Sequence, residues 1–239
     1  MRPSDSHEVS QLNELKVDIN ALTFTAHYKL DGDIIMSEQM PIFGGWAGGI
    51  EETAIVDVAT TLGAFSLVGA DWHLDGPIHV RWGNTTAREV LMVAGHCGRA
   101  VDRNTHLILG NQYYTSAGPC TEMCLLEAAA QAVTDCTSGR EIVDGCASAK
   151  GVAQDYTTAM ETRFMAYAIR AVAGEELEKT NRALDKLVSL YEKNFKTAPK
   201  GKPFQECYNV ASLLPTDEYI EVFGKALKTF EGCGFKLKL

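Results

Sequence analysis

The stretch Asp33-Ile34-Ile35-Met36-Ser37-Glu38 decides the fold class of this 239-residue chain. It is a short apolar run that ends on a carboxylate, and a glycine-rich turn and a helical pattern follow it. The same order recurs near residues 70–74 and 105–110. Short strands that alternate with helices predict an α/β fold with a parallel sheet. Polar groups at successive strand ends predict an active-site rim, because parallel β/α barrels present their chemistry there.

About four strands are predicted, which is half the number that closes a β/α barrel. The chain is therefore expected to be either a small doubly wound sheet or part of a larger barrel. Residues 1–153 are expected to carry the β/α units and the rim, and residues 154–239 the closing and C-terminal helices of the same domain. The predicted strands are 34–40, 70–74, 105–110 and 142–147, and the predicted helices are 9–28, 51–68, 86–100, 121–137, 157–173, 175–194 and 216–232.

Composition narrows the class of protein. The formal net charge of −9 argues against a nucleic-acid or anionic-membrane surface as the main function. The seven cysteines are an odd number, and their spacing is not that of a compact disulfide scaffold. This predicts reduced thiols. The first twenty residues do not resemble a signal peptide, and no apolar stretch is long enough to span a bilayer. These features together predict a cytoplasmic protein.

Two motifs favour packing over chemistry. The turn Gly44–Gly49 precedes a helix and could cradle phosphate, but Glu51 and Glu52 follow it, which favours a tight turn instead. Cys120 and Cys124 lie one helical turn apart without a second tight pair for zinc. Buried cysteines that pack a helix are the favoured interpretation, and a thiol nucleophile at Cys120 is the alternative. The sequence thus predicts no metal site.

Three polar positions, Glu38, Gln112 and Tyr114, carry more weight than the others. Glu38 ends an apolar run, so its carboxylate is expected either to be paired or to have a raised pKa that suits proton transfer. Gln112 and Tyr114 point to one side if the chain after the third strand stays extended. His73 at a strand end is expected to be structural. Ser6-His7-Glu8, taken alone, predicts a helix cap at Ser6 with Glu8 in the first turn.

Several long stretches resemble the monomethylamine:corrinoid protein methyltransferases of methanogenic archaea. They are Asp5 to Lys16 (DSHEVSQLNELK), Glu38 to Gly45 (EQMPIFGG), Trp72 to Pro77 (WHLDGP), Gly110 to Tyr114 (GNQYY), Ala117 to Glu127 (AGPCTEMCLLE), Gly139 to Ile142, Leu187 to Asn194 and Phe204 to Tyr208. The resemblance covers essentially the whole chain and implies the C-terminal half of a (β/α)8 barrel. The other half, with the residue pyrrolysine, is not part of this sequence.

The resemblance also implies a function. Enzymes of that family pass the methyl group of monomethylamine to cobalt(I) of a separate corrinoid protein, so the corrinoid cofactor is carried by the partner. The amine is thought to add to the imine of pyrrolysine. The resemblance further implies a homo-oligomer.

Residue by residue, the family's pocket residues match Glu8, Glu38, Gln112 and Tyr114. One glutamic acid would protonate the imine nitrogen and the other would take a proton from methylammonium. Gln112 and Tyr114 would hold the reacting groups in orientation. Which glutamate is the acid stays open at this point, and a non-catalytic half-barrel that binds the corrinoid protein or self-associates is the alternative function.

Overall fold

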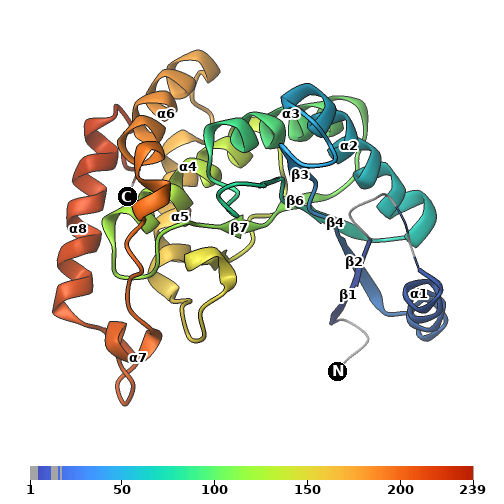
Figure 1. Ribbon diagram of the computed structural model, residues 1–239, viewed down its shortest axis with the longest axis horizontal. Coiled ribbons are helices and arrows are strands. Elements are labelled where there is room, and N and C mark those ends of the chain that lie inside the picture. Colours follow the sequence, from blue (N-terminus) through green and yellow to red (C-terminus); the bar gives the residue numbers. More distant parts are fainter. Residues whose placement is uncertain (1–4, 12–15, 17, 239) are drawn as a thin grey trace.

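The computed structural model describes residues 5–11, 16 and 18–238. Its centre is a parallel four-stranded sheet in the order β1-β2-β4-β6 (Figure 1). The strands are β1 (Ser6–Ser10), β2 (Ile34–Glu38), β4 (Trp72–Asp75) and β6 (Leu109–Asn111). The register places Ser10 beside Glu38, Glu38 beside Leu74 and Leu74 beside Gly110. The C-terminal ends of all four strands therefore meet at one edge of the sheet.

Short strands extend this edge. β3 (Ile42–Phe43) pairs with β5 (Ile78–His79), and β7 (Tyr113–Tyr114) pairs with β8 (Cys146–Ala147), both in parallel. The antiparallel pair β9 (Tyr208–Asn209) and β10 (Leu214–Pro215) lies farther along the chain.

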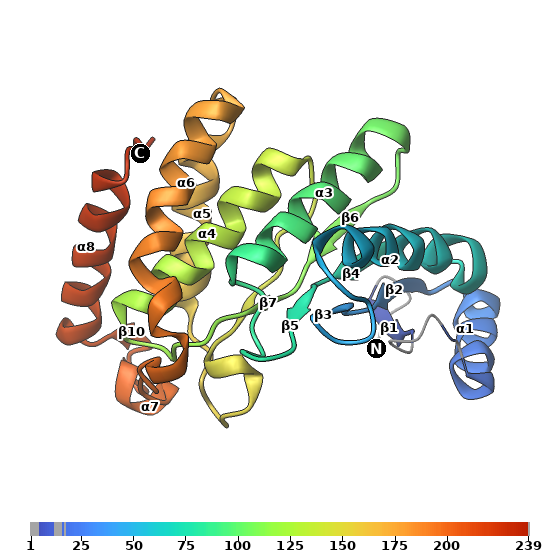
Figure 2. The ribbon, with the colours of Figure 1, turned by 45° about the horizontal axis from the view of Figure 1, so that its top comes forward.

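Helices follow the strands and lie side by side in a curved layer (Figure 2). They are α1 (Ile19–Asp31), α2 (Ile50–Gly63) with a π-helical turn (Ala64–Val68), α3 (Arg88–Asn104), α4 (Glu122–Ser138), α5 (Ala159–Val172), α6 (Leu177–Tyr191) with a 3-10 extension (Glu192–Thr197), α7 (Phe204–Cys207) and α8 (Asp217–Gly232). Helix α4 is buried along most of its length and packs against α3, α5, α6 and α8. One hydrophobic core accordingly runs from α3 to α8.

The two faces of the sheet differ. On β1, His7 and Val9 are buried against the helical layer, whereas Ser6, Glu8 and Ser10 are exposed. The alternation continues on the neighbouring strands, because Ile34 and Ile108 are exposed apolar side chains. Side chains alternate between the two faces of a strand, so one face of the sheet is covered and the other is open.

Most predicted helices are confirmed to within a few residues, and so is the α/β class with a parallel sheet of four strands. Two predictions near the ends of the sheet are wrong. Of the predicted helix 9–28, Val9 and Ser10 belong to strand β1, helix α1 starts at Ile19, and residues 12–15 and 17 lie outside the described residues. Ser6-His7-Glu8 is part of strand β1 rather than a helix cap with a first turn. The predicted strand 142–147 shortens to Cys146–Ala147 and pairs with β7 outside the main sheet. Within the described residues, no helix combines the length and apolar character needed to cross a membrane.

Candidate active site at the strand ends

Glu8 and Glu38 lie on the open face of neighbouring strands. Glu8 is exposed on β1 and accepts a hydrogen bond from Ser10 Oγ at 2.7 Å. Glu38 ends β2 and is half-buried. A side-chain hydrogen bond joins the two carboxyl groups. The structure thus brings together two residues that are 30 positions apart in the sequence.

The pKa of Glu38 indicates how this pair is protonated. The pKa of Glu38 is raised from 4.5 to about 7. Burial is the largest cause, and the hydrogen bond and negative charge of Glu8 add to it. The charge of Asp144 acts in the same direction, whereas a hydrogen bond with Gln112 lowers the pKa. Two carboxyl groups in contact cannot both ionise cheaply, so they share one proton. Near neutral pH, Glu38 is therefore partly protonated.

Gln112 and Tyr114 approach the same carboxyl pair. Gln112 hydrogen-bonds to Glu38, and the charges of Glu38 and Glu8, after burial, raise the pKa of Tyr114. Both side chains thus act on the same carboxyl pair, as expected if they share one side of an extended segment. All four predicted site residues lie in one cluster.

The segment that carries Gln112 and Tyr114 is held from behind by two buried side chains. Gln131 on α4 donates from Nε2 to the carbonyl oxygen of Gln112 at 2.5 Å and accepts from Thr85 Oγ1. The backbone N–H of Tyr114 donates to Thr85 Oγ1 at 2.9 Å, and the N–H of Thr85 donates to the Tyr114 carbonyl at 3.0 Å. This network fixes the backbone on both sides of Tyr113.

Two glycines allow the close approach of these residues. A Cβ atom at Gly76 would lie only 2.7 Å from Cβ of Gln112. Gly151 has a φ of +65°, and a Cβ there would lie 2.8 Å from Cε1 of Tyr114. Any larger residue would push the amide or the ring out of place.

A pocket of about 260 Å³ opens beside Glu38. Met40, Ile42 and Ile78 give it an apolar wall, and Ser10 and Glu38 give it a polar end. A carboxyl group next to an apolar wall suits a small cation with a methyl group.

The residues that tune and support this cluster were not predicted from the sequence. Asp144 acts on both Glu38 and Tyr114 through its charge. It lies inside the predicted strand 142–147, where a carboxylate among Ile142, Val143 and Cys146 was the available signal. Gln131 and Thr85 gave no signal, because polar residues inside helices and loops are common.

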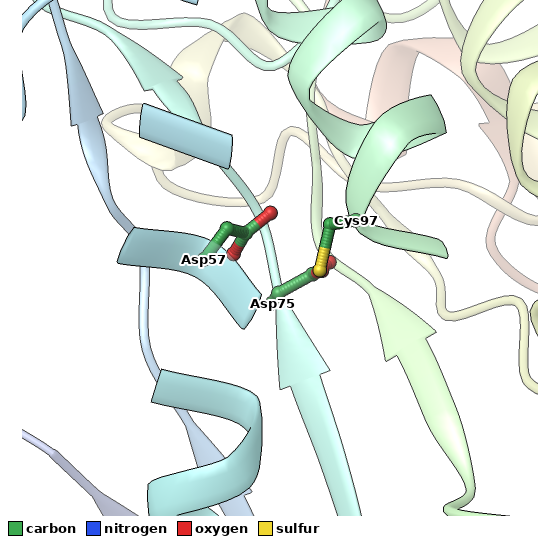
Figure 3. Close-up of side chains that lie close together, drawn as sticks. All are labelled: Asp57, Asp75 and Cys97. Carbon is green, nitrogen blue, oxygen red and sulfur yellow. The ribbon is translucent and has the colours of Figure 1, made fainter. Parts of the chain in front are cut away.

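A second carboxyl pair lies on the covered face of the sheet (Figure 3). Asp57 from α2, Asp75 from the end of β4 and Cys97 from α3 place one ligand-type atom each within 4.8 Å of one another, and all three are buried. Burial, the charge of Asp75 and a hydrogen bond between the two carboxyls raise the pKa of Asp57 well above its usual value. Burial and the charges of Asp57 and Asp75 likewise raise the pKa of Cys97.

Arg140 supplies the positive charge of this second cluster. Its Nη1 donates to Asp75 Oδ1 and to the Gly110 carbonyl, both at 2.7 Å, and its Nε lies 3.2 Å from Asp135 Oδ1. Asp135 also accepts from Asn111 Nδ2 and from the Tyr113 hydroxyl. The guanidinium lies between the carboxylates of Asp75 and Asp135, and its single positive charge offsets one of their two negative charges. The cluster ties the ends of β4 and β6 to α3 and α4.

His73 belongs to this covered side. It is fully buried in β4, and desolvation lowers its pKa to about 4, so its ring is neutral. The prediction that His73 is structural agrees with this position.

The packing interpretations of the glycine and cysteine motifs are also supported. The Glu52 carboxylate accepts a hydrogen bond from the Gly49 N–H at 3.0 Å and so occupies the amino end of α2 where a phosphate would bind. Cys120 and Cys124 are buried, and burial raises the pKa of both thiols. A nucleophilic cysteine needs the opposite shift.

Comparison with known proteins places this geometry in a family. The family model described as "Monomethylamine methyltransferase MtmB" matches residues 1–235. The chain belongs to the monomethylamine methyltransferase family. Monomethylamine methyltransferase MtmB1 of Methanosarcina barkeri is 60% identical over 234 residues, which are 98% of this chain and 51% of that protein. Its counterpart from Methanosarcina acetivorans is 60% identical over 231 residues, 97% of this chain and 50% of the relative.

Solved structures agree. The crystal structure of the Methanosarcina barkeri monomethylamine methyltransferase superimposes with a TM-score of 0.96 at 60% identity, over 98% of this chain and 51% of that chain. The structure of a hydroxylamine complex of MtmB matches with the same TM-score. The chain spans about half the length of the relatives it matches, namely their C-terminal half.

Proposed function

We propose that this chain forms the C-terminal half of a (β/α)8 barrel that transfers the methyl group of monomethylamine to cobalt(I) of a cognate corrinoid protein. The observation that carries the proposal is the convergence of Glu8, Glu38, Gln112 and Tyr114 at the ends of adjacent parallel strands, in a chain of the monomethylamine methyltransferase family. Such a rim is where barrel enzymes hold their chemistry.

The open face of the sheet supports the half-barrel. Exposed Ile34 and Ile108 lie on it together with the polar cluster, and apolar side chains on an uncovered sheet call for a second layer. Residues 1–153 and 154–239 would form one domain, because a single hydrophobic core joins α3 and α4 with α5 to α8. The complete enzyme would act in the cytoplasm of a methanogenic archaeon as a homo-oligomer.

The raised pKa of Glu38 supports one choice of acid and base. Glu8 would hold methylammonium and take one proton from it, freeing the lone pair of nitrogen. Glu38, which is partly protonated near neutral pH, would deliver its proton to the imine nitrogen of pyrrolysine supplied by the other half of the enzyme. The corrinoid of the partner protein would supply cobalt(I) as the methyl acceptor.

Gln112 and Tyr114 would act by orientation. The Gln112 amide hydrogen-bonds to Glu38, and the charges of both glutamates act on the Tyr114 hydroxyl. Their backbone is fixed by Gln131 and Thr85, so the two side chains keep their positions before the amine arrives.

The test is methylation of the corrinoid protein by the complete, pyrrolysine-containing enzyme, followed by the absorbance change of cobalt(I). Monomethylamine is expected to drive the change, and a Glu231→Gln control on the exposed surface of α8 should leave the rate unchanged. Absence of methyl transfer by a folded complete enzyme that still binds the corrinoid protein would overturn the proposal in favour of a non-catalytic binding role.

A further inference from the structure

A groove on the outer helical layer is separate from the candidate active site. It runs between α3 and α6 over the C-terminal turns of α4, three helices that lie side by side in Figure 2. Its volume is about 670 Å³. On α3 the lining residues run from Arg88 to Arg99 and on α6 from Leu177 to Val188, at spacings of three and four residues. At 1.5 Å per residue each wall is about 16 Å long, which is three turns of a helix.

The floor is made of small side chains. Gly95 of α3 lies close to Thr134 of α4, with 3.6 Å between a Cβ built on Gly95 and Cγ2 of Thr134. Ser138 and Thr137 continue this floor along α4. Small residues at the base of a groove allow another backbone to approach closely.

The walls are apolar and incompletely covered. Leu91, Leu184 and Val188 line the inner part, and Met92 and Leu177 stand at the edges with exposed fractions of 47% and 44%. Large apolar side chains exposed in a concave surface mark an interaction site more often than isolated ones on a convex surface do.

The rim of the groove is positively charged. Arg99, Arg182 and Lys186 line it, and Arg182 approaches Glu178 only at 4.0 Å. Of the described residues that line the groove, Asp185 alone is acidic. Arg88 forms ion pairs with both Asp185 and Glu192. This concentration of cations is unusual on a chain whose formal net charge is −9.

We propose that this groove docks an acidic amphipathic helix of another protein, about three turns long. Its apolar residues at positions i, i+3 or i+4, and i+7 would pack between Met92 and Leu177, and its flanking carboxylates would face Arg99, Arg182 and Lys186. Recognition of this kind uses a hydrophobic stripe for affinity and complementary charges for orientation. A nucleic acid or a free anion would leave the apolar walls unused.

The test uses the complete protein and two synthetic helical peptides. Both carry the same leucine stripe, and their flanks carry glutamate in one and lysine in the other. Fluorescence anisotropy should show the glutamate peptide binding at least tenfold more tightly than the lysine peptide, with affinity that falls as salt is added. Arg99→Glu should weaken the glutamate peptide about tenfold or more, since one reversed charge pair at a partly exposed site is worth about 1–2 kcal/mol. Lys228→Glu, an equal charge change on the exposed side of α8, should stay within twofold of the unmodified protein.

A neutral variant and the oligomeric state complete the test. Met92→Ser removes the apolar edge without a change of charge and should weaken the glutamate peptide as well. Equal binding of the two peptides, or equal effects of Arg99→Glu and Lys228→Glu, would overturn the proposal. So would a protein that binds neither peptide but dissociates into smaller assemblies on Arg99→Glu, because a second copy would then occupy the groove.

Discussion

Two carboxyl pairs lie on opposite faces of the same parallel sheet, and they differ in what balances their charge. Asp57 and Asp75 on the covered face are fully buried, and Arg140 donates directly to Asp75. Glu8 and Glu38 on the open face share a proton, and the described residues around them add a further carboxylate, Asp144, rather than a cation. The Asp57–Asp75 pair has a cation of the same chain, Arg140, as its partner. The Glu8–Glu38 pair has none among the described residues around it, so a positively charged ligand would suit it.

This difference separates a structural cluster from a site. Burial and a neighbouring carboxyl raise the pKa of one member in both pairs, so a raised pKa alone does not identify chemistry. The open pocket beside Glu38, and the absence of a described cation next to the Glu8–Glu38 pair, distinguish that pair as a candidate site. The pocket beside Glu38 is open and has an apolar wall, whereas the Asp57 carboxyl is enclosed between α2, β4 and α3.

The largest effect is expected from Glu38→Gln in the complete enzyme. The amide keeps the shape of the side chain but cannot deliver a proton, so methyl transfer should fall by about 10²- to 10⁴-fold. The free energy of unfolding should change little. Single-turnover methylation of the corrinoid protein measures the rate, and a loss smaller than about threefold would contradict the role given to Glu38.

Arg140→Met should act on folding rather than on chemistry. The change strands Asp75 and Asp135 as buried carboxylates without their cation, which should cost about 3–5 kcal/mol. Chemical denaturation measures this loss. Stability within 1 kcal/mol of the unmodified protein would mean that the covered cluster is not held by its charges.

Thr85→Val tests the support of the open site from behind. The substitution removes the acceptor for the Tyr114 N–H and the donor to Gln131, and it nearly preserves volume. Stability should fall by about 1–2 kcal/mol for the lost hydrogen bonds. The rate of methyl transfer should fall about tenfold with the pH profile unchanged. Thr197→Val, at an exposed position, serves as the matched control; an equal effect of both would refute a positioning role.

The smallest effect is expected from Asp57→Asn. The native carboxyl holds a proton because its pKa is raised, so an amide should replace it with a change below about 1 kcal/mol near neutral pH. A raised folded-state pKa makes the native protein bind more protons than the unfolded chain, and stability then falls as pH rises. The variant should lose less stability toward alkaline pH. Denaturation at several pH values checks this, and a steeper decline would contradict it.

The helices were predictable because their apolar period, caps and ends agree. Thr121 caps α4 by accepting from the Cys124 N–H, Thr216 caps α8, and Gly139 ends α4 with a φ of +88°. The parallel arrangement followed from the alternation of strands and helices. The strand β1 at one end of the sheet, and the pairing of residues 146–147 outside it, could not be predicted from this alternation.

Strand β1 was missed because its open face carries polar residues. Serine, glutamate and serine alternate with buried His7 and Val9, a period of two that was present in the sequence but was outweighed by the helical spacing of the residues after it. Glu38, Gln112 and Tyr114 were singled out by their positions after predicted strands, whereas Glu8 was assigned to the site only through the resemblance. Their convergence depends on strand register, which a single sequence does not fix.

The most direct test of the account is the pH dependence of single-turnover methyl transfer, compared between the unmodified complete enzyme and Glu38→Gln. If Glu38 holds the shared proton with a pKa of about 7, the rate should decline above that pH with the loss of one proton. The variant should show a low rate without that decline. A variant that keeps the same decline near pH 7 would contradict the claim that the Glu8–Glu38 pair supplies the proton.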